Sequence, residues 1–132
     1  MVLIKLNKRE IKINVRKLNE IGKFIGLMFR TRQTKNLLFS FNKKKRYSIH
    51  SLFVFFDFMA IWLDGKNNVL EWKIAKPFSF YIAPKKPFSS MIELPFNKDN
   101  KKLIDFIVDK GKDLNSDDAL YKHKNVFSKK EV

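Results

Sequence analysis

The chain has 132 residues, no cysteine and a formal net charge of +15 at pH 7. Apolar residues make up 45% of it, which supports one packed domain and excludes bulk disorder. The lack of cysteine excludes disulfide scaffolds, thiolate zinc sites and cysteine nucleophiles.

The first part of the chain predicts a hairpin, a helix and a strand. Residues 2–6 and 11–15 flank a short polar turn, and the second run alternates apolar and polar side chains, as a half-buried strand does. The apolar spacing becomes helical over 18–28. Residues 37–41 alternate again and predict a strand, and the basic run 42–46 predicts the turn that follows it.

The middle of the chain predicts central strands. Residues 47–56 and 58–63 are apolar on both faces, so we expect both runs to be covered on each side. A polar turn separates them from another strand at 69–74. The three prolines of 77–87 favour an edge strand or a connecting arm there.

The last third predicts a short strand at 91–94 and a helix at 101–110 that Gly111 ends. The predicted fold class is therefore mainly β, a sandwich or barrel of antiparallel strands with one or two short helices. We expect residues 1–112 to form a single β domain and residues 113–132 to form a polar C-terminal tail.

The positive charge has two explanations. Only five of the 28 basic residues are arginine, the residue best suited to bidentate phosphate and guanine contacts. Lys, Phe, Ile and Asn are abundant and can all be encoded by A/T-only codons, so compositional drift explains much of the excess. The alternative is a single-stranded nucleic-acid binder in which aromatic and basic residues interleave. Its candidate residues are Lys44, Lys45, Arg46, Lys85 and Lys86.

Targeting signals are not apparent in the sequence. The first six residues contain no charged segment followed by a long apolar one, so we expect no signal peptide. The longest apolar stretch, at 52–63, has twelve residues, whereas a spanning helix needs about 20. We therefore expect a cytoplasmic protein without a transmembrane segment.

The sequence gives little support for a catalytic site. The chain has no Gly-x-Ser-x-Gly elbow, no phosphate-binding glycine loop, and only two histidines, His50 and His123. No carboxylate cluster accompanies either histidine, so we expect no metal and no cofactor. A small hydrolase using paired carboxylates stays open as a third hypothesis. Its carboxylates would come from Asp57, Asp64, Glu71 and Glu93, although Glu71 is expected on an outward, polar strand face.

Several sequence blocks occur together in a specific order. They are Gly26–Arg30 (Gly-Leu-Met-Phe-Arg), Leu37–Phe41, Ser48–Phe56 running on to Gly65, Lys76–Phe78 and Ile92–Leu94. In this order the chain resembles the family named domain of unknown function 192, particularly its archaeal branch, over Val2–Lys112. The resemblance implies a jelly-roll-like β-sandwich with small helices. It implies no activity, because the family has no established one.

One departure from the family pattern concerns a Pro-x-Asp turn. By position, Asp57 stands in place of the proline and Met59 in place of the aspartate. Strand alternation puts residues 57 and 59 on the same face, so Asp57 can supply a carboxylate nearby.

These observations favour a non-catalytic binding domain for a small ligand or a protein partner. The candidate ligand-binding residues are Arg30, His50, Asp57 and Glu93. Structural roles compete with these assignments. His50 also fits a hydrogen-bonded position at the core edge, and Arg30 fits a helix C-terminus or an ion pair.

Overall fold

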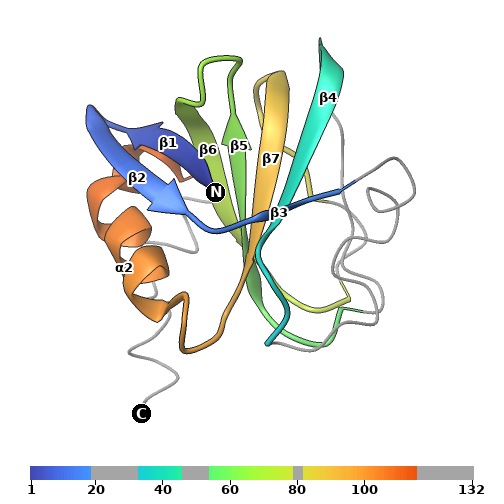
Figure 1. Cartoon of the computed structure of the whole chain (residues 1–132), viewed down its shortest axis with the longest axis vertical. Helices are drawn as coiled ribbons and strands as arrows, with labels where there is room; N and C mark the ends of the chain where they lie inside the picture. Colours follow the sequence, from blue (N-terminus) through green and yellow to red (C-terminus); the bar gives the residue numbers. More distant parts are fainter. Residues whose placement is uncertain (19–32, 46–53, 79–81, 116–132) are drawn as a thin grey trace.

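The computed structural model describes residues 1–18, 33–45, 54–78 and 82–115, with the backbone alone for 41–45. These residues form seven strands in two sheets, one α-helix and one short 3₁₀ helix (Figure 1). The mainly β prediction is confirmed. Neither sheet closes into a barrel within the described ranges, and the arrangement fits a small β-sandwich with a short helix.

The hairpin predicted at the start of the chain is present. Strands β1 (Val2–Leu6) and β2 (Arg9–Ile13) pair antiparallel, with Leu6 opposite Arg9. The two turn residues, Asn7 and Lys8, have φ angles of 46° and 71°. Two left-handed residues in succession match the twist of the flanking strands, which explains the tight connection.

The main sheet has five strands in the order β3-β4-β7-β5-β6, and β7 is its centre (Figure 1). The short β3 pairs parallel with β4, and all the other neighbours are antiparallel. The strands are β3 (Arg16–Lys17), β4 (Leu37–Lys45), β5 (Phe58–Leu63), β6 (Val69–Ala75) and β7 (Phe88–Pro95).

Three sequence predictions are corrected here. Residues 42–45 continue β4, and Lys45 lies opposite Phe88 after a register irregularity. Strand β7 begins at Phe88, earlier than predicted, because the proline before it ends the connecting arm. Residues 54–57 are outside any strand although Val54 and Phe56 are buried, because apolar sequence predicts burial and does not specify strand pairing.

Most of the helix predicted at 18–28 lies outside the described residues. The helix predicted near the C-terminal end is confirmed as α2 (Lys101–Lys110). Its buried residues are Ile104 and Ile107, and Gly111 follows its last turn. The 3₁₀ helix η1 (Lys112–Leu114) continues the chain to Asn115, where the described fold ends.

The five-stranded sheet is covered on both faces, and every residue of β5 is buried. The face that packs against α2 and the β1–β2 hairpin is called the first face, and it carries Met59, Ile61 and Ile92. The opposite face is called the second face, and it carries Ala60, Trp62 and Met91. Alternate residues along each strand therefore belong to different cores.

Candidate functional site

Glu93 is a carboxylic acid at the centre of the sheet. It lies in β7 with Leu37 of β4 on one side and Ala60 of β5 on the other. Only 5% of the residue is exposed, and its Oε1 atom has no hydrogen-bond partner among the residues that the structure describes. Burial raises the pKa of Glu93 from 4.5 to about 8, because a buried charge is poorly solvated. The side chain is therefore mostly neutral at pH 7.

Two further polar side chains lie in the adjacent row of the second face. Trp62 of β5 is opposite Glu71 of β6 and opposite Met91 of β7. The indole Nε1 of Trp62 is buried and donates no hydrogen bond within the described ranges. Glu71 is also buried, which corrects the expectation that its strand face is polar. Its Oε2 atom accepts no hydrogen bond from any described residue.

These three residues belong to one face because side chains opposite each other in register point the same way. Ala60 and Met91, their neighbours, are both part of the second core. We call Trp62, Glu71 and Glu93 the polar triad. It contributes one donor and two carboxyl oxygens that have no hydrogen-bond partner among the described residues.

The carboxyl group of Glu71 is held by one oxygen only. Its Oε1 accepts the backbone N–H of Lys85 at 2.7 Å and that of Lys86 at 2.9 Å. This contact fixes the connection before β7 against β6 and orients the carboxyl group. The second oxygen is then left as an acceptor on the covered face.

Asp57, the other described ligand candidate, lies apart from the polar triad. Its Oδ2 is 2.8 Å from Nζ of Lys76, and the aspartate is 7% exposed. Asp57 lies two residues before Met59, which packs in the first core, so continued alternation puts the two side chains on the first face. Glu93 belongs to the second face. The fold thus places Asp57 and Glu93 on opposite sides of the sheet and does not combine them in one site.

The remaining sequence candidates have different positions. Arg30, His50 and Arg46 lie outside the described residues. The backbones of Lys44 and Lys45 belong to the end of β4. Lys85 and Lys86 have exposed side chains, and only their backbone amides contact Glu71. In the parts of the chain that the structure describes, no three His, Cys, Asp or Glu side chains come together as metal ligands.

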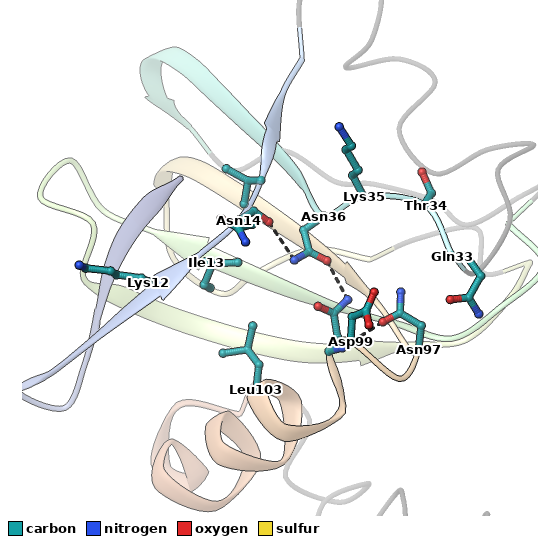
Figure 2. Close-up of a pocket in the computed structure, with 12 residues that line it drawn as sticks. Lys12, Ile13, Asn14, Gln33, Thr34, Lys35, Asn36, Asn97, Asp99 and Leu103 are labelled. Carbon is teal, nitrogen blue, oxygen red and sulfur yellow. Dashed lines mark hydrogen bonds between the residues drawn. The ribbon is translucent and has the colours of Figure 1, made fainter.

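A cleft of about 580 Å³ lies in another part of the fold. Figure 2 shows the residues that line it. It lies between the exit of the hairpin, the residues that precede β4 and the start of α2. Its lining is rich in amides, and Ile13 and Leu103 form part of its apolar wall.

Two amides of the cleft, Asn36 and Asn100, are bound to each other and to backbone carbonyls. Asn36 donates to the carbonyl of Asn14 at 3.0 Å, and Asn100 donates to Oδ1 of Asn36 at 2.7 Å (Figure 2). Asn100 also donates to the carbonyl of Pro95 at 2.8 Å. This network joins the hairpin, β4 and the approach to α2. The hydrogen bonds of this network are made within the fold, so the network serves as a structural junction. Each residue of the polar triad, by contrast, keeps one polar atom without a partner among the described residues.

A family model described as an uncharacterised ACR, domain of unknown function 192, matches residues 2–105. The chain belongs to this family. A curated relative, a UPF0127 protein of the archaeon Pyrococcus furiosus, is 34% identical over 89 residues, which covers 66% of this chain and 76% of the relative. The family and the archaeal similarity expected from the sequence blocks are confirmed.

Two solved structures share the fold. One is a candidate transcription regulator from Sinorhizobium meliloti, with a TM-score of 0.63 and 20% identity over 76% of this chain and 81% of that one. The other is a protein of unknown function from Novosphingobium aromaticivorans, with a TM-score of 0.64 and 14% identity over 76% of this chain and 75% of that one. At these identities the likeness concerns the fold alone.

Sequence reasoning selected Glu93 as a ligand-binding candidate and missed Trp62. It named Glu71 only among the carboxylates of the hydrolase hypothesis, on a strand face expected to be polar. Glu71 interrupts the run Val-Leu-Glu-Trp, and a charge inside an apolar strand is the one local signal that it is buried. Trp62 has no such signal, because a tryptophan in an apolar strand is ordinarily a core residue. The missing hydrogen bond of its indole is visible only in three dimensions.

No helix in the described ranges is long and apolar enough to cross a membrane.

Proposed function

We propose that this domain binds a small polar ligand without catalysing a reaction, and that the polar triad holds the ligand. The supporting observation is the set of three buried polar atoms without partners on one sheet face. Leaving a buried polar group unsatisfied costs about 1–3 kcal/mol. Three such groups in adjacent rows are costly for stability, and a bound ligand that supplies the missing partners offsets that cost.

The chemistry of the triad restricts the ligand. Oε2 of Glu71 accepts hydrogen bonds, the indole of Trp62 donates one, and the mostly neutral carboxyl of Glu93 can accept one and donate one. A complementary ligand therefore carries N–H or O–H donors and at least one acceptor. A ligand with a basic nitrogen has the further advantage that it stabilises the ionised form of Glu93.

The experiment is a thermal-shift and calorimetric screen of the full chain at pH 7 with small amines, amino acids, amides and sugars. We expect at least one class to raise the melting temperature of the wild type. The variant Glu93→Leu removes the unpartnered carboxyl at similar volume, so it is expected to be as stable as the wild type or more stable, and to lose the response.

The matched control is Ser90→Ala. Ser90 is a buried polar residue of the same strand, but it lies opposite Leu63 of the first core. This variant should respond to the ligand as the wild type does. A screen in which no compound shifts the wild type, or in which Glu93→Leu responds equally, would contradict the proposed function.

A further inference from the structure

Lys73 is a further polar side chain on the second face of the sheet. It lies in β6 opposite Ala60 of β5, and Ala60 is in turn opposite Glu93 of β7. The neighbours of Lys73 along its strand, Trp72 and Ile74, both pack in the first core. Because side chains alternate along a strand, the side chain of Lys73 points to the second face, as that of Glu93 does.

The residue between Lys73 and Glu93 is small. Ala60 contributes only a methyl group, so no bulky side chain separates the lysine from the glutamate along this row. Neighbouring strands are about 4.8 Å apart, which puts the α-carbons of the two charged residues roughly 10 Å from each other. Trp62 and Glu71 form the adjacent row of the same face. The polar triad and Lys73 are therefore grouped around one alanine.

Lys73 lies at the rim of this group. Strand β6 is the last in the order of the sheet, whereas β7 is its centre. Lys73 is half-buried, and its ammonium group forms no ion pair with any described residue. Because lysine is rarely taken out of water without a partner, this ammonium group is well placed to bind an anionic group of a ligand.

The donors and acceptors of the group are balanced. The indole of Trp62 and the ammonium group of Lys73 donate hydrogen bonds. Oε2 of Glu71 accepts them, and the carboxyl group of Glu93 can accept one. A complementary ligand presents an anionic acceptor at one end and N–H donors at the other. A carboxylate and an ammonium group on one small molecule meet this requirement.

We propose that the polar triad and Lys73 together bind a small zwitterion of the amino-acid class, with its ammonium group toward Glu93 and its carboxylate at Lys73. This orientation follows from the strand order, since Glu93 lies in the central strand and Lys73 in the outer one. A neutral polyol, or an amine without a carboxylate, would leave the ammonium group of Lys73 unpaired. This inference rests on the proposed function, and it adds the class of ligand and the residue that selects it.

The test is isothermal titration calorimetry of the full chain at pH 7 with ω-amino acids from glycine to 6-aminohexanoate. Each amino acid is compared with the n-alkylamine that lacks its carboxylate. We expect the amino acid of best-fitting length to bind about tenfold more tightly than its amine, because it gains a charge-assisted hydrogen bond to Lys73. Lys73→Met keeps a long aliphatic side chain without the charge, so it should bind both compounds with the affinity that the wild type has for the amine.

The matched control is Lys102→Met, which removes an exposed lysine from α2, on the first face of the sheet. It should keep the preference of the wild type for the amino acid. Lys73→Arg retains the positive charge and should keep the preference too. Circular dichroism melts of these variants establish that each is folded. If Lys73→Met does not fold, equal affinity of the wild type for the amino acid and the amine still overturns the inference.

The outcomes separate this inference from the proposed function. Equal affinity of the wild type for an amino acid and its amine would overturn the inference alone, as would a preference that Lys73→Met retains. Binding of amines or sugars that Glu93→Leu abolishes, without binding of any amino acid, would also overturn only the inference. A wild type that binds no compound of the wider screen would contradict the proposed function and the inference together.

Discussion

Gly111 is required by close packing at the end of α2. Its φ of −114° is accessible to any residue, so backbone freedom is not the reason for glycine here. A Cβ atom at this position would lie 2.9 Å from the carbonyl oxygen of Ile107, 2.9 Å from Cδ1 of Leu6 and 3.1 Å from Nε1 of Trp72. The indole of Trp72 also donates to the carbonyl of Gly111 at 2.6 Å.

We predict that Gly111→Ala destabilises the domain by about 1–3 kcal/mol, the usual cost of forcing extra volume into a packed interior. Gly65→Ala is the matched control, because a Cβ atom there would meet only Oγ of Ser89, at 3.7 Å. Urea unfolding of both variants measures the difference. Equal stability of the two variants would contradict the packing explanation.

Met59, which stands where the resemblance to the family implies an aspartate, is fully buried in the first core. We predict that Met59→Asp destabilises the domain by about 3 kcal/mol or more, because an unpaired carboxyl would be buried. Met59→Leu, which conserves volume, should cost less than about 1.5 kcal/mol. Chemical denaturation distinguishes the two, and a tolerated aspartate would indicate a partner for it at this site.

At the level of elements, the chain after α2 is attached to the sheet. Asn115 is 7% exposed and forms a parallel bridge with Trp72 of β6. The carbonyl of Gly111 accepts the indole N–H of the same tryptophan. Trp72 therefore connects β6 with the segment that runs from the end of α2 through η1.

We predict that a chain ending at Asn115 melts within about 5 °C of the full chain, a difference on the order of 1 kcal/mol for a domain of this size. A chain ending at Lys110 should melt markedly lower, because it lacks Gly111 and Asn115. Circular dichroism melts test both truncations. A large drop for the longer truncation would show that residues 116–132 contribute to stability.

On the scale of the whole molecule, the position of Glu93 links folding to pH. Its folded pKa of about 8 is above the unfolded value of 4.5. The neutral acid is favoured in the folded state, so the contribution of Glu93 to stability is fully present below pH 4.5. It is lost as the pH rises from 4.5 through about 8.

We predict that Glu93→Gln gains stability relative to the wild type as the pH increases from about 4.5 to 8, because an amide does not ionise. The expected difference at neutral pH is on the order of a few kcal/mol. Urea unfolding at a series of pH values gives the difference in the free energy of unfolding between the variant and the wild type. The contributions of the other titrating groups are the same in both proteins and cancel. A difference that does not change with pH would mean that Glu93 has a normal pKa.

Much of the fold follows from local pattern. The β1–β2 hairpin follows from two apolar runs that flank a short polar turn, the second of them alternating, although β2 is Arg9–Ile13 where the sequence predicted 11–15. Helix α2 follows from an apolar stripe that Gly111 ends. The burial of β5 on both faces follows from its continuous apolar composition. These features depend on neighbours in the sequence, so the sequence alone is sufficient to predict them.

The sequence by itself also determined the family, through an ordered set of blocks, and it selected Glu93 as a candidate. Only the tertiary structure decided that β7 is the central strand, that Glu93 shares a face with Trp62 and Glu71, and that Asp57 lies on the other side of the sheet. The physical reason is strand order and register. Both depend on long-range pairing, and together they determine which side chains of distant strands share a face, whether a carboxyl has a partner, and whether a phenylalanine is core or surface.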